Sequence, residues 1–342
     1  MRTTGQLVWN EKWRLAALSR SDLVTASLAA VVVGMVFLLF HALGVTTEAH
    51  RFGRSVFLWM ISHWQTSGPT LGTATDYSHG WLIPIASIAV IWYRRRELMA
   101  APRSVSKWGL AVVIGALLLH WMGARAQLPR LSLFGLVGLT WGIPFYLFGW
   151  SFARILIFPC AYLIFCIPLN FLDSLTLPLR VYMTAATHFI LNGLGLHIVQ
   201  SGTALHSVVS LNVPVLLHPD NIKYSLEIAD PCSGIRSLIA MVAITAIYAY
   251  LTQRTLLKKW VLFLAAVPLA LVGNTVRIIT IALVSEALGQ RIGAGLYHDF
   301  SGYLIFMAIT IPLMILLGNI LDADVKESWQ RWKRALLHTS SS

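Results

Sequence analysis

Three short polar clusters stand beside long apolar runs and contain the residue types that acyl transfer needs. The first, DPCSGIR, contains Cys232; the second, GNTVR, ends at Arg277; the third, YHD, is centred on His298. A cysteine can act as a nucleophile, an arginine can bind an oxyanion, and a histidine can move a proton. Each cluster falls at the expected end of an apolar run. The sequence therefore predicts that the three side chains meet at one face of a bilayer.

Cys232 follows a proline and precedes Ser233 and a glycine, so a helix is expected to begin here with little bulk around the sulfur. Arg236 comes four residues later, which is one helical turn away on the same face. A thiol at a helix N-terminus beside a guanidinium has a depressed pKa, and the thiolate is the nucleophile. The alternative is a cysteine that only packs, which is the commoner role of an isolated cysteine near a membrane helix.

Arg277 lies deep in an apolar run. An arginine at the centre of a membrane helix costs about 2.5–3.5 kcal/mol on insertion scales, so it marks a site or a pathway. The alternative is an arginine whose charged end reaches the headgroups. Asn274, one turn earlier, adds a second polar side chain to the same face. This pair favours a site, in which Arg277 binds an anion or an oxyanion.

His298 is the candidate acid and base, because it stands at the outer end of a run next to the one that carries the arginine. Asp299 is a possible orienting partner. His79 occupies a similar position on an earlier run, and it is either a second candidate base or part of the entrance. Glu227 and Asp230, on the approach to the cysteine, either receive a basic group of the substrate or are ordinary solvated residues.

The composition is that of a membrane protein. Hydrophobic residues make up 57% of the 342 and charged residues only 12%, the mean hydropathy is +0.70, and soluble domains carry about 25% charged residues. The net charge of +12 does not indicate a nucleic-acid partner, because the lysines and arginines cluster between apolar runs as topology signals. Cys160 and Cys166 lie within one apolar run and are expected to pack as small hydrophobes. We expect no metal and no other cofactor.

The predicted fold class is an all-α integral membrane protein with about eight transmembrane helices. A further semi-apolar stretch, 55–70, is expected to lie in the interface or to re-enter the bilayer. The eight apolar runs cover residues 22–44, 80–93, 108–123, 132–150, 154–171, 234–252, 260–284 and 300–320.

Orientation follows from where the positive charges fall. When eight spans alternate from a cytoplasmic N-terminus, most of the 26 lysines and arginines lie on the cytoplasmic side. Both termini are then cytoplasmic, and the candidate site is extracytoplasmic. We expect one polytopic membrane domain over 1–342, with a basic cytoplasmic tail over 321–342 and no cleavable signal peptide.

The region 172–231 departs from the pattern of apolar runs. Residues 179–194 show polar positions at helical spacing and predict an amphipathic helix. Short runs rich in β-branched residues follow, separated by turn signals such as Ser201-Gly202. They predict a small extracytoplasmic β-element around residues 196–230, which delivers the chain to Cys232.

The motifs PCSGIR, NTVR and a histidine followed by Gly302, together with YSHGWLIP around His79, resemble the exosortase/archaeosortase family over about residues 55–320. The chain resembles the short form, without an extra C-terminal domain. The resemblance implies a cysteine protease and transpeptidase of the bacterial inner membrane, with Cys232, Arg277 and His298 as its catalytic set. It also implies a partner, the C-terminal sorting signal of secreted proteins, which consists of a Pro-containing motif, a transmembrane helix and a basic end.

On this hypothesis the signal is cleaved through a thioester at the outer face, and the product passes to an acceptor. The alternative function is a non-catalytic transporter or assembly component of polysaccharide export, in which Arg277 lines a polar path. That alternative predicts tolerance of Cys232→Ser but not of Arg277→Ala. A haem or quinone protein is disfavoured, because no pair of histidines falls on facing spans at comparable depth.

Overall fold

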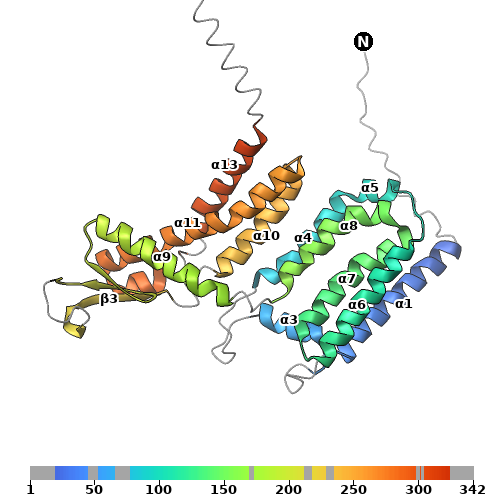
Figure 1. Ribbon diagram of the computed structural model, residues 1–342, viewed down its shortest axis with the longest axis horizontal. Helices are drawn as coiled ribbons and strands as arrows, with labels where there is room; N and C mark the ends of the chain where they lie inside the picture. The colour runs from blue at the N-terminus through green and yellow to red at the C-terminus, as the bar shows by residue number, and fades with distance from the viewer. Residues whose placement is uncertain are drawn as a thin grey trace, which may run out of the picture.

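Long helices dominate the structure, a computed structural model that describes residues 20–44, 53–65, 78–168, 173–211, 218–228, 235–297, 301 and 304–323. Figure 1 shows the N-terminal helices α1 and α3–α8 side by side, with α9, α11 and a small sheet at the opposite end of the molecule. The longer helices are α1 (Arg20–Ala42), α3 (Val56–Trp64), α4 (Leu82–Tyr93), α5 (Arg95–Ala100), α6 (Lys107–Arg125), α7 (Pro129–Phe148), α8 (Trp150–Tyr162), α9 (Asp173–Gly193), α10 (Ile235–Thr252), α11 (Leu256–Leu288) and α13 (Ile311–Asp322).

A helix occupies each of the eight predicted apolar runs. By length and composition, three of the described helices can cross a membrane, namely α6, α7 and α11, and five shorter apolar helices accompany them. The predicted helical membrane fold is confirmed to this extent, and the number of spans stays a prediction. The semi-apolar stretch 55–70 contains α3, whose tryptophans Trp59 and Trp64 are buried.

The bounds of two runs need correction. Within the described part of the run 154–171, which ends at residue 168, the helix extends as far as Cys166, in α8 and the 3-10 turn η2 (Leu163–Cys166); Pro168 follows, and the residue before a proline avoids the helical region. The run 260–284 is too short, because α11 has 33 residues. Its start is capped by the Thr255 side chain, which accepts from the backbone of Lys258, and its end is set by Gly289 at φ 86°.

Glycines allow α6 and α7 to pack at very close range. A Cβ on Gly109 would stand 2.2 Å from the backbone nitrogen of Tyr146, and one on Gly123 would stand 2.5 Å from that of Ser132. Small residues at helix interfaces let backbones approach where lipid provides no hydrophobic driving force between helices. This hairpin therefore forms a compact core of the N-terminal half.

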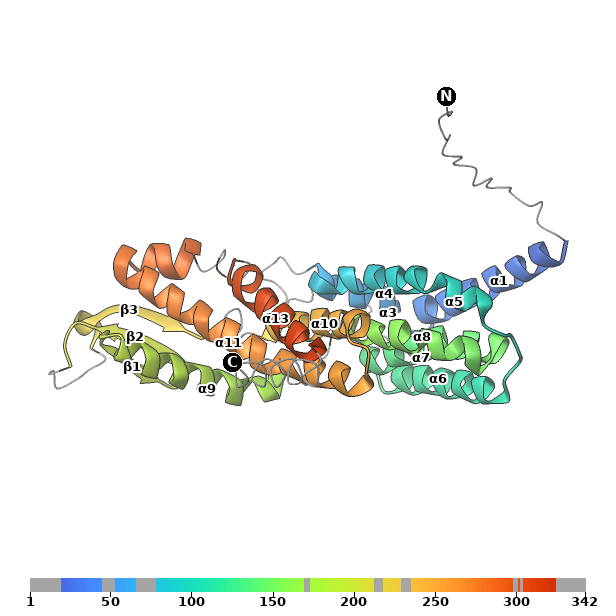
Figure 2. The same ribbon diagram turned by 90° about the horizontal axis from the view of Figure 1, so that it is seen from above.

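The predicted β-element is a three-stranded antiparallel sheet in the order β1-β2-β3, with strands β1 (Ile198–Ser201), β2 (Ala204–Val208) and β3 (Ile222–Glu227). Gly202, at φ 61°, opens the two-residue turn that pairs Ser201 with Ala204. This turn fixes the register, so β2 begins at Ala204. The sheet lies beside α9 and the far end of α11 (Figure 2).

The amphipathic helix is confirmed as α9, which begins six residues earlier than predicted. Its buried face, including Met183 and Leu191, packs with strand residues and with Ile278 of α11 in one core cluster. The opposite face exposes Tyr182 and Phe189. The helix therefore links the sheet to α11, the helix that carries the candidate arginine.

Helix α10 joins the two halves of the molecule. Ala243 and Ala246 pack into the cluster of the N-terminal half, whereas Met241 packs with residues of α11 and α13. At its C-terminal end, the ring of Tyr250 stacks on Phe158 of α8, with centroids 3.8 Å apart. Figure 2 shows α10 and α13 in the middle of the elongated molecule.

Candidate active site

The candidate site residues divide into those that the structure describes and those outside it. Cys232, Ser233 and His298 lie outside the described residues, as does the side chain of Arg236, whose backbone belongs to the first turn of α10. Their roles stay predictions. The described members of the set are Arg277, Asn274, His79 and Glu227, and their surroundings show which chain segments gather around the arginine.

Arg277 is half-buried on α11 and donates a hydrogen bond from Nε to Oγ of Ser301, at 3.1 Å. Ser301 is completely buried and lies three residues after His298. A serine hydroxyl is a good acceptor for a guanidinium, because charge-assisted hydrogen bonds are stronger than neutral ones. The side chain of Arg277 is therefore directed toward the chain segment that contains the candidate histidine.

Asn274, one turn earlier, is buried and donates from Nδ2 to the sulfur of Met183 on α9, at 3.3 Å. The two polar side chains that the sequence placed on one face thus contact different neighbours. Arg277 contacts the segment after the candidate histidine, and Asn274 contacts α9. The supporting role of Asn274 beside the arginine stays a prediction.

Gly273 brings another element close to the arginine. A Cβ at this position would stand 2.4 Å from Oγ1 of Thr310, which is buried at the end of the π-helical turn η6 (Phe306–Thr310). A second π-helical turn, η5 (Arg291–Tyr297), follows α11. π-Turns occur often at functional sites, and these two turns flank residues 298–305.

The residues on either side of the undescribed segments converge on the middle turns of α11. Ile228, four residues before Cys232, is buried in one cluster with Ile278 and Ile281, and Tyr297 packs against the same cluster. On the other side of the cysteine, the first turns of α10 pack against α11 through Leu238. The chain thus approaches and leaves the cysteine and histidine motifs next to the turn of Arg277.

His79 lies in a different environment. It belongs to the 3-10 turn η1 (Ser78–Trp81), which packs against α3, α4 and η2. Next to it, a Cβ on Gly80 would stand 2.3 Å from Nε1 of Trp64, and Trp81 meets the same indole edge to face at 5.0 Å. Trp64 donates to the carbonyl of Cys166, at 2.9 Å. Both roles of His79, as a second candidate base or as part of the entrance, stay predictions.

Glu227 is exposed at the last position of β3, where it pairs with Ala204. This exposure is compatible with both predicted roles of Glu227, which are to receive a basic group of the substrate or to be an ordinary solvated residue. Cys160 and Cys166 are buried and free, as predicted for packing residues.

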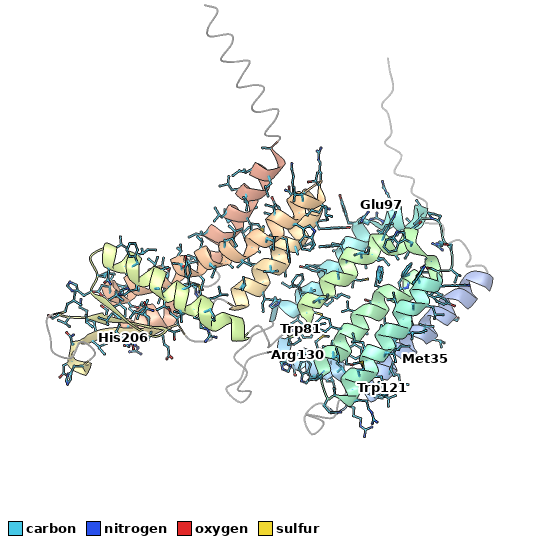
Figure 3. All side chains as sticks on the ribbon, viewed as in Figure 1. Met35, Trp81, Glu97, Trp121, Arg130 and His206 are labelled. Carbon is cyan, nitrogen blue, oxygen red and sulfur yellow. The ribbon has the colours of Figure 1, made fainter. Side chains whose placement is uncertain are left out.

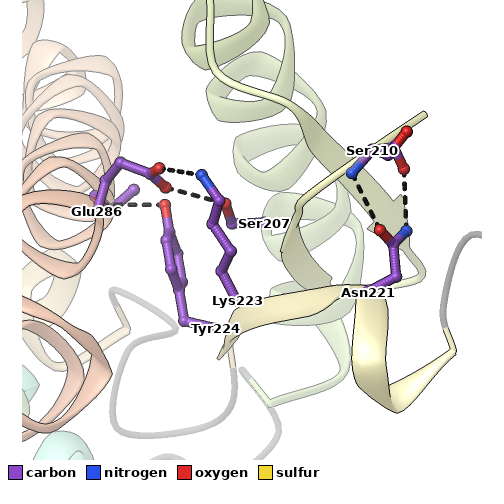
Figure 4. Close-up of polar contacts among 7 residues, drawn as sticks. Ser207, Ser210, Asn221, Lys223, Tyr224 and Glu286 are labelled. Atoms are coloured by element: carbon purple, nitrogen blue, oxygen red, sulfur yellow. Dashed lines mark hydrogen bonds and ion pairs between the residues drawn. The ribbon is translucent and has the colours of Figure 1, made fainter.

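A polar cluster that was not predicted from the sequence connects the sheet to the C-terminal end of α11 by hydrogen bonds. The carboxylate of Glu286 accepts from Oγ of Ser207 on β2, at 2.9 Å, and from Nζ of Lys223 on β3, at 2.6 Å (Figure 4). Tyr224 donates to the carbonyl of Ala282, at 3.1 Å. Burial, and then the charge of Glu286, raises the pKa of Tyr224 to about 12, so the hydroxyl remains a donor.

A signal for this cluster was present, because Glu286 is an acidic residue at the end of an apolar helix and Lys223 and Tyr224 stand in a β-rich run. The partners are far apart in sequence, however, so their pairing required the fold. A reciprocal pair of hydrogen bonds between the Asn221 side chain and the backbone of Ser210 supports the outer end of the sheet (Figure 4).

Comparison with known proteins agrees with the resemblance seen in the motifs. No curated protein and no solved structure matches the chain. The family model described as "Transmembrane exosortase (Exosortase_EpsH)" matches residues 64–315. The match covers well over half of the chain and includes Cys232, Arg277, His298 and His79. The apolar helices, the matched region and the motifs within it agree, and the chain belongs to the transmembrane exosortase family of membrane proteins.

Proposed function

We propose that this chain is a membrane cysteine peptidase and transpeptidase. It cleaves the C-terminal sorting signal of secreted proteins at the outer face of the bacterial inner membrane and transfers the product to an acceptor. Cys232 is the nucleophile, His298 the acid and base, and Arg277 the oxyanion or motif binder. The observation that carries the proposal is the hydrogen bond between Arg277 and Ser301, beside a cluster that contains Ile228 and Tyr297.

The covalent chain limits how far the undescribed residues can be from this cluster. An extended chain spans at most about 3.3–3.6 Å per residue, Cys232 follows Ile228 by four residues, and His298 follows Tyr297 directly. Ile228 belongs to the cluster of Ile278, and Tyr297 packs against that cluster. The thiol and the imidazole are therefore within chain reach of the same turn of α11 as the guanidinium.

The length of α11 supports an extracytoplasmic position for the chemistry. Lys258 and Lys259 stand in the first turn of the helix, and Arg277 follows Lys258 by about 19 residues, or about 28 Å at a rise of 1.5 Å per residue. The hydrocarbon core of a bilayer is about 30 Å thick. With the lysines at the cytoplasmic surface, the guanidinium reaches the opposite interface, where it can remain hydrated.

The reaction follows from these groups. The Cys232 thiolate attacks the scissile carbonyl carbon, and the oxyanion is stabilised by Arg277, supported by Arg236 and positioned by Asn274. As the C–N bond breaks, the imidazolium of His298 gives its proton to the leaving amine, and a thioester remains. An incoming amine, or water, then loses a proton to the imidazole and attacks the thioester, which releases the thiolate.

The substrate supplies the other contacts. Its transmembrane helix lies against the spans, its basic end remains in the cytoplasm, and its Pro-containing motif reaches the outer interface. Ser233 keeps the approach to the sulfur open, Glu227 receives a basic group of the motif, and His79 shapes the entrance.

The experiment is a processing assay in cells that express the chain with a secreted protein carrying such a signal. Cys232→Ala, Cys232→Ser and His298→Ala should accumulate the uncleaved protein, and Arg277→Lys should retain less activity than the native chain because a lysine cannot provide a planar fork. Cys160→Ala, which removes a buried cysteine remote from the site, is the matched control.

The same variants separate the proposal from the alternative of a non-catalytic component of polysaccharide export, when export of the polysaccharide is measured beside processing of the signal. If Cys232→Ser processes normally while Arg277→Ala loses export, the alternative holds and the peptidase proposal fails. Correct membrane insertion of every variant, checked by fractionation, excludes misfolding as the cause.

A further inference from the structure

A cavity of about 460 Å³ lies at the end of the bundle where α4 and α5 meet the start of α8. Polar side chains of Arg94, Glu97, Ser151 and Arg154 line it, together with apolar groups such as Ile155. Figure 3 shows Glu97 at this end of the bundle and Trp121 at the opposite end. Lys259 on α11 contacts the ring of Tyr250, which bonds Arg94 in the cavity. Arg277 lies about 18 residues further along α11, about 27 Å at 1.5 Å per residue, so the cavity is well separated from the candidate active site.

Two of the charged groups in the cavity neutralise each other. Arg94 donates from Nε to Oε1 of Glu97, at 3.1 Å, and forms a second bond to the other carboxylate oxygen. It also donates to the hydroxyl of Tyr250, at 2.6 Å. The Arg94 guanidinium holds the pKa of Glu97 below its ordinary value, so the carboxylate is ionised and its charge is compensated.

Arg154 is different. Among the residues that the structure describes, its guanidinium has no hydrogen-bond or ion-pair partner, and the residue is exposed. Ser151 stands one turn before it on the same face of α8 and also lines the cavity. After the Arg94–Glu97 pair is neutralised, the cavity keeps one positive charge and a neighbouring hydroxyl donor. This donor set suits a phosphate group.

The surroundings favour a phosphate that is attached to a lipid. Ala101, Pro102 and Ile155 form an apolar wall, and Trp92 and Trp150 are exposed nearby, as is typical of side chains at the headgroup level. Basic residues that attract anionic membranes crowd this end of the bundle. They are Arg95, Arg96, Arg103, Lys107, Arg254, Lys258 and Lys259.

We propose that this cavity binds the phosphodiester headgroup of an anionic phospholipid, with Arg154 and Ser151 as donors to the phosphate oxygens. The acyl chains lie against the apolar wall formed by Pro102 and Ile155. The site does not depend on the peptidase activity. The bound lipid fixes the depth at which this end of the bundle lies in the leaflet. The helices that line the cavity also pack against α10.

The test measures binding of phosphatidylglycerol to the purified, delipidated full-length protein in detergent, by native mass spectrometry with a titration of the lipid. Arg154→Gln should weaken binding about tenfold, in line with the loss of a charge-assisted hydrogen bond, and Ser151→Ala should weaken it less. Glu97→Gln should strengthen binding, because it releases Arg94. Arg96→Gln is the matched control, since Arg96 is at the same end of the bundle but does not line the cavity.

Three results would overturn the proposal. The first is that Arg154→Gln binds phosphatidylglycerol as tightly as the native chain does. The second is that Arg96→Gln weakens binding as much as Arg154→Gln does. The third is that the native chain binds phosphatidylcholine as tightly as phosphatidylglycerol. A fourth arm adds glycerol 3-phosphate or inorganic phosphate, and displacement of the lipid at equal concentration would assign the cavity to a soluble phosphate instead. Elution as a single species, with an unchanged melting temperature, shows that each variant is folded.

Discussion

Arg277 on α11 and Ser301, a residue beyond the histidine motif, are joined by a 3.1 Å hydrogen bond between Nε and Oγ. The bond links two chain segments 24 residues apart, and its acceptor is completely buried. A hydrogen bond at Nε restricts rotation of the planar guanidinium and so fixes the direction in which its plane lies. The orientation of the arginine therefore depends on the segment that also carries the candidate base.

Ser301→Ala should reduce processing of the sorting signal while the protein level stays near normal. A hydrogen bond to a charged group contributes about 1.5–3 kcal/mol, so a loss of about tenfold or more in the rate is expected if the bond orients the guanidinium. Pulse-chase measurement of cleavage gives this rate. Thr252→Ala removes an exposed hydroxyl that donates to the carbonyl of Tyr248 and accepts from the adjacent Gln253 side chain, away from Arg277, and it should have no effect. An equal effect of both variants would show that the orientation by Ser301 is unimportant.

Gly273→Ala should destabilise the packing of α11 against η6, because its Cβ would stand 2.4 Å from Oγ1 of Thr310. Overpacking of this kind costs about 1–3 kcal/mol, and the stiff β-branched side chain of Thr310 cannot turn away freely. Thermal unfolding in detergent should show a lower midpoint for the variant.

A second substitution at Thr310 identifies the cause. Gly273→Ala combined with Thr310→Ala removes the clashing oxygen, and it should recover much of the lost stability. The combination with Thr310→Val puts a methyl group in place of the oxygen and should not recover it. Recovery with valine would mean that the contact with Oγ1 is not the source of the loss.

The sequence predicted the elements whose signals are local. Apolar runs of span length located the helices, polar residues at helical spacing located α9, and Ser201-Gly202 located the hairpin. Local signals were weaker at the ends of helices, as for α8, where apolar residues continue beyond the point at which Pro168 stops the helix.

Contacts between distant residues could not be predicted in this way. Glu286 binds Ser207, 79 residues away, and Arg94 binds Tyr250, 156 residues away; neither pair has a spacing that reveals it. Asn274 and Arg277 were predicted to share a face, but the neighbours that this face meets depend on how α9 and Ser301 pack. The sequence thus indicated which residues could do chemistry, and the fold decided what holds them in place.

Gly80→Ala should disturb the aromatic cluster near His79. The added Cβ would stand 2.3 Å from Nε1 of Trp64, a buried indole that donates to the carbonyl of Cys166 at 2.9 Å. The expected cost is about 1–3 kcal/mol for the displaced side chain, and the lost hydrogen bond adds about 1 kcal/mol. The fall in melting temperature in detergent measures this loss of stability.

Gly115→Ala is the control for this substitution. Gly115 lies inside α6 with nothing within 4 Å of the position of its Cβ, so alanine should be neutral or slightly stabilising there. A comparable loss of stability at both positions would show that the contact with Trp64 is not the cause at Gly80.

Glu286→Ala should loosen the sheet from α11 more than Lys223→Gln does. The lysine is partly exposed, and ion pairs of that kind contribute about 0–1 kcal/mol. Loss of the carboxylate also leaves the buried hydroxyl of Ser207 without its acceptor, which costs about 1–3 kcal/mol. Hydrogen exchange of the amides of β2 and β3 should therefore rise strongly in Glu286→Ala and slightly in Lys223→Gln. A reversed order would contradict the role of Ser207.

The orientation of the chain can be tested with single cysteines at the two ends of the molecule. Ser201 is exposed at the turn of the sheet, and Arg96 is exposed on α5. Ser201→Cys and Arg96→Cys can therefore be compared in a Cys232→Ala background. The cysteines that remain there, Cys160 and Cys166, are buried. A membrane-impermeant maleimide should label Ser201→Cys in intact spheroplasts and Arg96→Cys only after lysis. This pattern is expected because basic residues such as Arg96 are retained on the cytoplasmic side, whereas the sheet lies at the far end of α11, which is longer than the hydrocarbon core is thick. Labelling of Arg96→Cys alone in intact spheroplasts would invert the topology and move the proposed chemistry to the cytoplasmic face.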